Sequence, residues 1–261
     1  MHVRSALVIL LLSTAFWPLG CARAHPPGAA SNRPPRPQTS ATAGPVDADP
    51  LVGAVFPGSA DLHTCTGSVL DSSTKNLILT AAHCLSSNLP TTFAPGFTEP
   101  AGTAARWAVD TIYLDPRWVA RQDPLADFAI ARVSRPDGRS VESVVGKGLT
   151  LGAAPIAGTI VKVTGYPLSV GGAPIGCRVG TATAPGGFPS LHCVGLTDGT
   201  SGAPWRTDTA VVGLIGGLDG GGCDEKVSYS PPFDGHVADL LHRAEGGGPG
   251  DAAPDLFADG C

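Results

Sequence analysis

Short apolar runs, separated by polar turn residues, recur through the middle of the chain. Five runs have the length of a β-strand and lie at residues 76–81, 107–114, 127–133, 158–165 and 210–216. Gly, Pro, Asp and Ser cluster between these runs, and such residues favour turns. No long segment repeats its apolar positions at the helical period, and the one short helical candidate is 236–243. The pattern predicts an all-β barrel or sandwich with a short C-terminal helix.

The N-terminal residues predict export. A positive charge at Arg4 precedes an almost wholly apolar stretch, and Ala-Arg-Ala at 22–24 fits signal peptidase, so residues 1–24 are predicted to be a secretory signal peptide. A transmembrane anchor needs about 20 apolar residues, and Pro18 interrupts the run. Lipidation at Cys21 is the other alternative, because Leu-Gly-Cys at 19–21 is similar to the end of a bacterial lipobox. A lipid there would anchor the protein to a membrane, whereas cleavage after residue 24 would secrete it.

Both ends of the chain differ in composition from the middle. Residues 25–50 are rich in Pro, Ala, Ser and Thr and lack an aliphatic run, which predicts a linker or pro-segment without fixed structure. The tail, residues 244–261, is rich in Gly, Pro and Asp. Only Leu256, Phe257 and a bond from Cys261 are expected to attach it to the folded unit. The predicted folded unit is therefore 51–243, one domain of ordinary size.

Charge and cysteine content narrow the function classes. The chain of 261 residues has 17 Lys and Arg, 22 Asp and Glu and a formal net charge of −5. Proteins that bind nucleic acid or an anionic membrane surface normally present a basic face, so neither partner is expected. Without the signal peptide the cysteine count is even, which predicts disulfides but leaves their pairing open. The cysteines concerned are Cys65, Cys84, Cys177, Cys193, Cys223 and Cys261.

Three short stretches carry residues suited to nucleophilic catalysis. His83 ends an apolar run (LTAAHC), Asp127 enters another (ADFAI), and Ser201 lies in a Gly-rich loop (TDGTSGAP). A catalytic serine needs a histidine to accept its proton and a buried acid to fix the histidine tautomer. Each residue alone is more simply explained as a structural histidine, a turn cap or a turn serine. The chain order His, Asp, Ser favours catalysis, because it is the order found in chymotrypsin.

These motifs resemble those of the chymotrypsin-fold (trypsin-like) serine proteases. Thr-Ala-Ala-His-Cys at 80–84 matches the family's histidine motif without a change, and HTCTGSV at 63–69 is similar to its H-x-C-x-G-S-[LV] strand. DFAI at 127–130 is similar to D-[ILF]-A-[LI], and GTSGAP at 199–204 resembles G-D-S-G-G-P. The likeness spans about residues 52–237 and is closest to the bacterial secreted branch, which includes glutamyl-endopeptidase-like enzymes.

The resemblance implies two Greek-key β-barrels, at about 51–134 and 135–243, packed with the active site in the cleft between them. It implies that His83 is the general base and acid, Asp127 its orienting carboxylate and Ser201 the nucleophile. The backbone N–H groups of Gly199 and Ser201 would form the oxyanion hole.

The resemblance also implies part of the disulfide set. By likeness, Cys65 and Cys84 should form the bond that closes the histidine loop. Cys193 lies eight residues before Ser201, not four as in many animal members, so the loop beside the pocket is closed differently, and we predict Cys177–Cys193. Cys223–Cys261 then follows by elimination.

Departures from the animal members bear on activation and specificity. Thr200 stands where most of them have an aspartate that pairs with a newly cut N-terminal amine, so activation by N-terminal insertion is not expected. Gly195 replaces the pocket aspartate of trypsins, which speaks against cleavage after Arg or Lys and favours a small or apolar side chain. The predicted substrate pocket consists of Gly195, Gly216, Gly217 and Leu218.

No metal or other cofactor is predicted. The acidic residues of the loop 219–225 are a conceivable calcium site, but their spacing matches no EF-hand. The expected protein is a secreted, monomeric serine endopeptidase that acts on polypeptides through an acyl-enzyme. The alternatives are a catalytically silent homologue that serves as a binding module and an esterase that uses the same triad.

Overall fold

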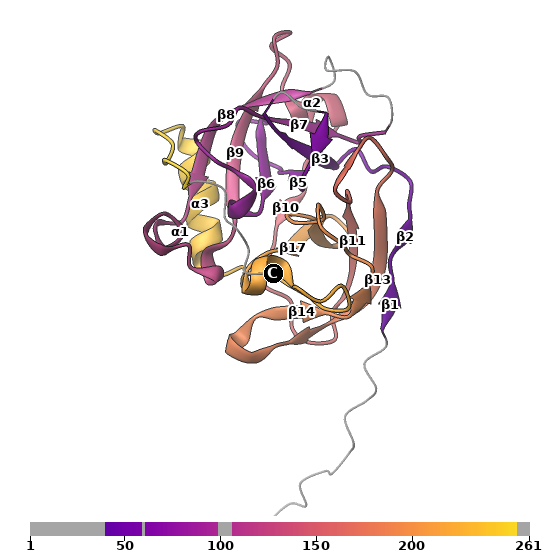
Figure 1. The fold of residues 1–261 in the computed structure, drawn as a ribbon. Helices are drawn as coiled ribbons and strands as arrows, with labels where there is room; N and C mark the ends of the chain where they lie inside the picture. The colour runs from indigo at the N-terminus through magenta and orange to yellow at the C-terminus, as the bar shows by residue number, and fades with distance from the viewer. Residues whose placement is uncertain (1–39, 59–60, 99–105, 255–261) are drawn as a thin grey trace, which may run out of the picture. The chain divides into compact units, whose positions relative to one another are not determined.

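The computed structural model describes residues 40–58, 61–98 and 106–254, and Figure 1 shows their arrangement. The predicted signal peptide, the lipidation candidate Cys21, the first part of the predicted linker and Cys261 lie outside these residues. Strands dominate the described ranges, with three short α-helices, so the prediction of a mostly β fold is confirmed. Within the same ranges, no helix combines the length and the apolar character that a bilayer crossing requires.

Barrel one is a closed antiparallel barrel with the strand order β3-β5-β6-β9-β8-β7. Its strand β6 is the apolar run LILT, and all four of its residues are buried. β9 pairs with β6 on one side and with β8 on the other, so the strand that follows Asp127 forms beside the one that leads to His83. The six strands are β3 (Val52–Pro57), β5 (Cys65–Val69), β6 (Leu77–Thr80), β7 (Thr91–Pro95), β8 (Trp107–Leu114) and β9 (Ala129–Ser134).

Barrel two is an open half-barrel built on an eight-stranded sheet, in which β10-β17-β16-β11-β13-β14-β18 follow one another and β2 also pairs with β13. Trp205 and the valines of β11 lie at the centre of its apolar core. Its strands are β10 (Thr150–Leu151), β11 (Ile160–Gly165), β13 (Ile175–Thr183), β14 (Pro189–Leu191), β16 (Pro204–Thr207), β17 (Ala210–Leu214) and β18 (Ser228–Tyr229). The remaining short strands are β1 (Ala41–Thr42), β2 (Gly44–Pro45), β4 (Leu62–His63), β12 (Ser169–Val170) and β15 (Cys193–Val194).

Three α-helices accompany the barrels. The predicted C-terminal helix is confirmed as α3 (Gly235–Gly246), whose N-terminus is capped by the Asp234 carboxylate. The apolar face of α3 packs on barrel one against β8 and β9. Helices α1 (Pro116–Arg121) and α2 (Val141–Val145) were not predicted, because five or six residues are too few to show a helical period. In α1 the start is nonetheless encoded by the Asp115 cap followed by a proline.

The N-terminal segment corrects one prediction. Residues 25–50 were expected to lack fixed structure, but β1 pairs with β15 and β2 pairs with β13. Asp49 also forms an ion pair with Arg206 at 2.5 Å and accepts a hydrogen bond from the N–H of Leu51. This part of the segment is therefore held by backbone pairing and one ion pair. Neither needs the aliphatic run whose absence led to the wrong prediction.

The start of the tail corrects another. Residues from 244 onward were expected to be tied down only by Leu256, Phe257 and Cys261, but Ala244 belongs to α3 and Asp251 anchors the chain to β8. The Asp251 carboxylate accepts hydrogen bonds from the N–H of Leu114 at 2.7 Å and from Arg243 at 2.6 Å. The carboxylate and the backbone N–H of one residue, Asp251, thus help to fix a segment whose composition alone favours disorder.

Candidate active site

His83 and Asp127 form the most constrained polar pair in the site. His83 lies in the 3₁₀ turn η1 (Ala82–Cys84) at the end of β6, and Asp127 ends the 3₁₀ turn η3 (Pro124–Ala126) just before β9. Pairing of β6 with β9 brings the two turns together. The Nδ1 atom of His83 lies 2.8 Å from Oδ2 of Asp127, and the side chains are 13% and 1% exposed. The imidazole of His83 is therefore partly exposed, whereas the carboxylate that it contacts is buried.

Asp127 is held as a carboxylate. Its Oδ1 accepts the backbone N–H of His83 at 3.0 Å, and its Oδ2 accepts the N–H of Gly217 at 2.7 Å. Burial by itself raises the pKa of Asp127, but the charge and hydrogen bond of His83 and the two N–H donors outweigh it, so the pKa lies below its usual value. An ionised carboxylate has no proton to donate, so the His83–Asp127 bond carries its proton on Nδ1. The other ring nitrogen, Nε2, is then the acceptor.

Ser201 lies on barrel two, in the turn between β15 and β16, and its backbone is fixed to barrel one. The N–H of Thr66 donates to the carbonyl of Ser201 at 2.7 Å. A Cβ at the next residue, Gly202, would overlap the Thr66 carbonyl and the Thr80 hydroxyl, which shows how closely the serine loop packs on the strand that leads to His83. The structure therefore brings the loop of Ser201 and the turn of His83 together across the two barrels.

Thr66 links several parts of the site and was not predicted from the sequence. Its hydroxyl donates to the carbonyl of Gly199 at 3.0 Å and accepts the N–H of Tyr166 at 2.9 Å. Its own carbonyl accepts the hydroxyl of Thr80 at 2.7 Å. The first two bonds join Thr66 to residues 133 and 100 positions away in the chain, so no local signal could have identified them. Thr66 did lie within the strand motif at 63–69, which was the only pointer.

The backbone around Ser201 is arranged to leave donors open. Gly199 adopts φ of +88°, and a Cβ there would overlap the backbone of Leu168, so glycine is required. Within the described residues, no partner accepts a hydrogen bond from the N–H of Gly199 or of Ser201, whereas the flanking N–H groups of Thr200 and Gly202 donate to Thr197 and Ile215. Two open N–H groups in one turn form a site for an oxygen that carries negative charge.

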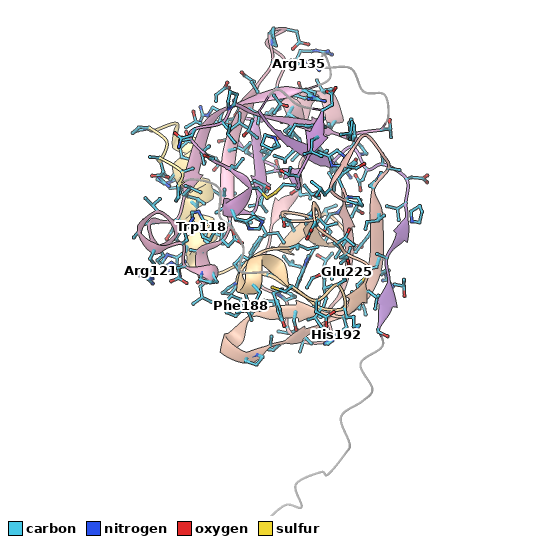
Figure 2. The ribbon with its side chains drawn as sticks, viewed as in Figure 1. Trp118, Arg121, Arg135, Phe188, His192 and Glu225 are labelled. Atoms are coloured by element: carbon cyan, nitrogen blue, oxygen red, sulfur yellow. A yellow bond between two sulfur atoms is a disulfide. The ribbon has the colours of Figure 1, made fainter. Side chains whose placement is uncertain are left out.

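A cavity of about 340 Å³ opens beside Ser201. None of the four predicted pocket residues lines it. Gly217 instead donates its N–H to Asp127, and Gly195 donates its own to the carbonyl of Glu225. Glu225 is labelled among the barrel-two side chains in Figure 2. The lining residues are Leu196, Thr197, Asp198, Thr200, Ser201, Ile215, Asp219, Gly220, Gly221, Gly222, Cys223, Glu225 and Ser228.

The lining of this cavity differs in charge from the pocket that the sequence predicts. Gly195 at the floor and Gly216, Gly217 and Leu218 at the wall predict a small, neutral pocket, whereas Asp198, Asp219 and Glu225 border this cavity. The carboxylates come from the loops on either side of Ser201, so their convergence depends on how those loops fold together. The four predicted pocket residues lie beside residues of the lining along the chain, such as Leu196, Ile215 and Asp219.

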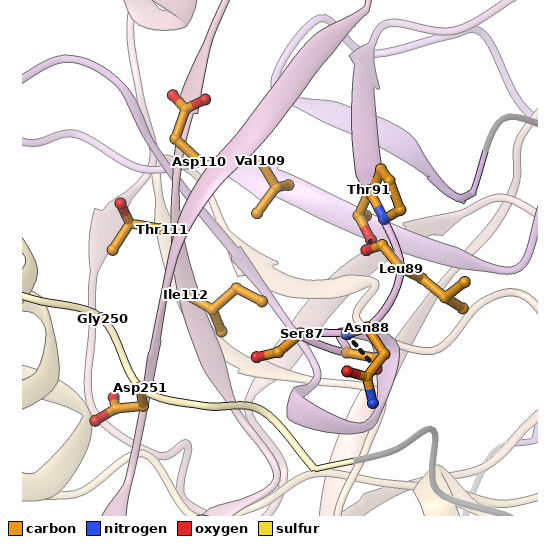
Figure 3. Close-up of a pocket in the computed structure, with 12 residues that line it drawn as sticks. Ser87, Asn88, Leu89, Thr91, Val109, Asp110, Thr111, Ile112, Gly250 and Asp251 are labelled. Atoms are coloured by element: carbon orange, nitrogen blue, oxygen red, sulfur yellow. Dashed lines mark hydrogen bonds between the residues drawn. The ribbon is translucent and has the colours of Figure 1, made fainter.

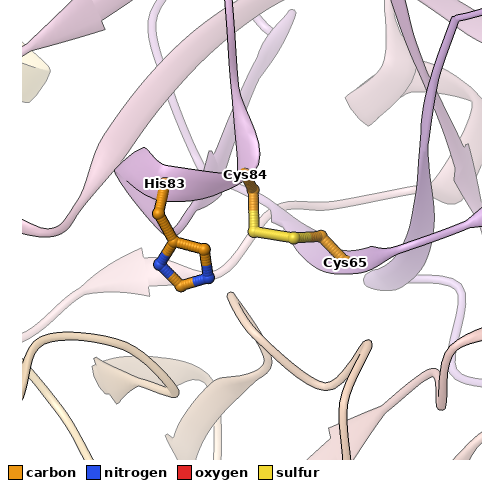
Figure 4. A group of neighbouring side chains, drawn as sticks. All are labelled: Cys65, His83 and Cys84. Atoms are coloured by element: carbon orange, nitrogen blue, oxygen red, sulfur yellow. A yellow bond between two sulfur atoms is a disulfide. The ribbon is translucent and has the colours of Figure 1, made fainter. Parts of the chain in front are cut away.

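Disulfides flank the site. Cys65–Cys84 and Cys177–Cys193 are both present, which confirms the two predicted pairs. Figure 4 shows His83 beside the first of them. Among the described residues, one donor of His83 and the sulfurs of Cys65 and Cys84 lie within 4.8 Å of one another. Both sulfurs belong to a disulfide and therefore offer no thiolate, so this group does not fit a metal ion.

The arrangement defines a class of protein. The hydrogen-bonded pair of His83 and Asp127 lies on barrel one, and the loop of Ser201 packs on the strand that leads to His83. These are the residue types that serine-type acyl transfer uses. The trypsin family model matches residues 42–175, just over half of the chain. The chain therefore belongs to the trypsin family, and its class of activity is that of a serine endopeptidase.

Comparisons with known proteins place the fold more closely. No curated protein matches the chain. A thermostable serine protease, AL20, from an extremophilic microorganism is 21% identical, with a TM-score of 0.66, 77% of this chain covered and 99% of that one. Protease Anisep from Arthrobacter nicotinovorans is 20% identical, with a TM-score of 0.67 and coverage of 78% and 100%. Human heparin binding protein is 15% identical, with a TM-score of 0.61 and coverage of 81% and 100%. At these identities the likenesses concern the fold, and the two bacterial-type proteases agree with the predicted branch.

Proposed function

We propose that this protein is a secreted serine endopeptidase whose triad is Ser201, His83 and Asp127. The observation that carries the proposal is the 2.8 Å contact between His83 and a buried Asp127 that is pinned by two backbone N–H groups. That contact fixes the imidazole tautomer and leaves Nε2 free of a proton, which is the state a serine nucleophile requires.

The reaction is acyl transfer through these groups. Ser201 Oγ attacks the carbonyl carbon of a peptide bond, and its proton passes to Nε2 of His83. The negative charge that develops on the carbonyl oxygen is stabilised by the N–H groups of Gly199 and Ser201. His83 then donates the proton to the leaving amine, and a water molecule, activated by the same ring nitrogen, releases the acyl group from Ser201. General acid–base catalysis contributes about 10²- to 10⁴-fold, and each oxyanion donor about 10²- to 10³-fold.

The cavity beside Ser201 is proposed to receive the side chain that precedes the cleaved bond. Because Asp198, Asp219 and Glu225 border it, an acidic side chain would be repelled there. We therefore expect a cleavage profile that lacks Asp and Glu at this position, unlike the glutamyl-specific members of the branch. A library of peptides with each side chain at that position measures the profile.

Secretion and monomeric state belong to the same proposal. Disulfides in the domain are typical of proteins from oxidising compartments. The leader at residues 1–24 then directs export, with Cys21 lipidation as the variant outcome. Mass spectrometry of the N-terminus of the exported protein separates a free end at residue 25 from a lipidated Cys21, and light scattering measures the oligomeric state.

The triad is tested by labelling the exported protein with a fluorophosphonate and mapping the modified peptide. The expected result is a mass increase on Ser201 that is absent in Ser201→Ala and strongly reduced in His83→Ala. Comparison of casein with short-chain nitrophenyl esters then separates an endopeptidase from an esterase. Absence of labelling in folded protein would overturn the proposal and indicate a binding module. A binding role of the kind that the name of the human relative states would need a polyanion site, which a net charge of −5 does not favour.

A further inference from the structure

The outer face of barrel two carries three positively charged side chains in one row. Lys162 of β11 lies directly opposite Arg178 of β13 on one side and directly opposite Arg206 of β16 on the other. Its neighbours along β11, Val161 and Val163, belong to the core of barrel two, so Lys162 points away from that core. Residues directly opposite one another share a face of the sheet, so all three cations lie on the outside of the barrel.

This row of cations is only partly neutralised by the protein. Like charges directly opposite each other destabilise a sheet. Asp49 forms an ion pair with Arg206 and so compensates one of the three charges. Among the described residues, no carboxylate forms an ion pair with Lys162 or with Arg178. Two adjacent positive charges are therefore left without a direct partner.

Arg178 also differs from the other described arginines. Each of the other eight bonds through its guanidinium to a carboxylate or, in Arg132, to a backbone carbonyl. The guanidinium of Arg178 has neither kind of partner within the described ranges. The unpaired guanidinium beside Lys162 indicates a counter-charge that the described chain does not supply.

A hollow of about 250 Å³ lies at this row of cations. The volume corresponds to about eight water molecules at about 30 Å³ each, which is room for a small polyatomic anion with some of its water. The hollow is lined by Ile160, Lys162, Arg178, Arg206, Thr207 and Asp208. Three cations thus converge with one carboxylate, and the Thr207 hydroxyl is a further possible donor.

Two other hollows of the described chain have the opposite charge. On barrel one, a hollow of about 620 Å³ has Asp110 and Asp251 as its charged residues (Figure 3). The cavity that contains Ser201 is bordered by three carboxylates. Neither lining includes a lysine or an arginine, so an anion would favour the barrel-two hollow over both.

We propose that Lys162, Arg178 and Arg206 form a binding site for a tetrahedral oxyanion of the phosphate or sulfate class. The planar guanidinium of Arg178 can donate to two oxygens of such an anion, and Lys162 adds a point charge. A tetrahedral anion has enough oxygens to contact cations from three strands, and so to link β13, β11 and β16. The hollow shares no lining residue with the cavity beside Ser201, so the proposal does not depend on the peptidase function.

Binding is tested by isothermal titration calorimetry of the exported protein with sodium phosphate and with sodium sulfate, at an ionic strength held constant with sodium chloride. Two or three charge-assisted hydrogen bonds correspond to a dissociation constant on the order of 1 mM. We expect one site per chain, and an affinity that falls about tenfold or more in Arg178→Gln. O-phosphoserine as a second probe identifies the source of the anion. Binding as tight as that of phosphate assigns the site to an oxyanion on a larger ligand, and weaker binding assigns it to the free ion.

Thermal unfolding gives an independent test, because the sign of one effect should reverse. In sodium chloride, Arg178→Gln should unfold at a higher temperature than the parent protein, since the repulsion from Lys162 is removed. In about 50 mM phosphate at the same ionic strength, the bound anion should stabilise the parent protein, so the variant should then unfold at the lower temperature.

Two further variants serve as controls. Arg121→Gln removes an exposed arginine of α1 with the same change in net charge, and should keep the phosphate affinity within about twofold. Asp208→Asn removes the one carboxylate of the lining and should tighten binding about threefold. An absence of phosphate binding, an equal affinity in the parent protein and Arg178→Gln, or an unchanged affinity in Asp208→Asn would overturn the site. The three cations would then be a solvated face of the barrel.

Discussion

Asp127 accepts three hydrogen bonds, and each holds a different part of the candidate site. Two of them join its carboxylate to His83, and the third joins it to Gly217 at the start of the loop beside the cavity. In Asp127→Asn an NH₂ group replaces one carboxylate oxygen. In the place of Oδ1 it faces the N–H of His83, and in the place of Oδ2 it faces the N–H of Gly217 and requires Nδ1 of His83 to become an acceptor. We expect kcat to fall about 10³- to 10⁴-fold at neutral pH with little change in KM.

Steady-state kinetics on a peptide substrate, with circular dichroism to confirm folding, measure this effect. Asp123→Asn is a matched control, because Asp123 caps η3 by accepting the N–H of Leu125. A loss below about tenfold in Asp127→Asn would show that His83 takes its tautomer from another group.

Thr66 illustrates how a residue outside the proposed triad can hold the loop that contains Ser201. Thr66→Val keeps the shape but removes the hydroxyl, which leaves the Gly199 carbonyl and the Tyr166 N–H buried without partners. Each lost partner costs about 1–3 kcal/mol, so we expect a lower free energy of unfolding by about 2 kcal/mol or more. Urea unfolding measures the change.

Thr66→Ser retains the hydroxyl and serves as the matched control. It should lose less stability than Thr66→Val and keep nearly full kcat. If the two variants unfold at the same urea concentration, the hydroxyl does not contribute to stability. The link between the barrels must then run through the Thr66 backbone alone.

At the scale of whole elements, the short strands β1 and β2 add a new edge to barrel two. The N–H groups of Ala41, Ala43 and Val46 donate to the carbonyls of His192, Val194 and Pro174. A chain that begins at Leu51 lacks these bonds and the Asp49–Arg206 pair, and it exposes the backbone of β13 and β15. With about 1 kcal/mol for each hydrogen bond, we expect it to lose about 3 kcal/mol of stability.

Thermal unfolding of chains that begin at His25 and at Leu51 tests this expectation. The longer chain should unfold at the higher temperature and cleave substrate without further processing. Equal midpoints would mean that residues 40–50 are dispensable, and that maturation can cut at the boundary predicted from composition. The Thr200 hydroxyl donates to the carbonyl of Thr197. Thr200 therefore has a local partner, whereas the aspartate of the animal members pairs with a new N-terminal amine.

The strands that could be predicted from the sequence and those that could not differ in the interactions that hold them. The strands at 76–81 and 107–114 were predictable because their own side chains form the core, as the buried run of β6 shows. β1 and β2 were not, since they are held by the backbone of β15 and β13. The same division runs through the site. The motifs selected the three residues of the proposed triad, but the contacts of Thr66 and Gly217 join distant parts of the chain, which spacing does not encode.

At the scale of the whole molecule, a buried histidine lies where the two barrels join. β4, which lies between β3 and β5 in the chain, pairs with β12, and the Nε2 atom of His63 donates to the carbonyl of Gly171 at 2.8 Å. The ring is enclosed by the aromatic rings of Phe56, Phe97 and Tyr166. Its Nδ1 atom is buried without a hydrogen-bond partner among the described residues, so protonation would place a new donor where nothing accepts it.

The stability of the molecule should therefore depend on pH through His63. Burial lowers the pKa of His63, the nearby charge of Arg106 lowers it further, and the bond to Gly171 only partly opposes them. The unfolded chain takes up a proton near pH 6.5 while the folded protein stays neutral, so the unfolded state binds more protons below that pH. Stability is complete above about pH 6.5 and falls as the pH drops toward the folded pKa. Buried carboxylates such as Asp127, whose pKa is also lowered, lose their contribution to stability only below about pH 4.

Urea unfolding between pH 7.5 and 5 should therefore show a midpoint that decreases as the pH falls. His63→Gln keeps a donor for Gly171 but cannot titrate, so its midpoint should depend less on pH. If the midpoint of His63→Gln depends on pH as strongly as that of the parent protein, the effect belongs to another histidine, and His63 does not make the contact between the barrels sensitive to acid.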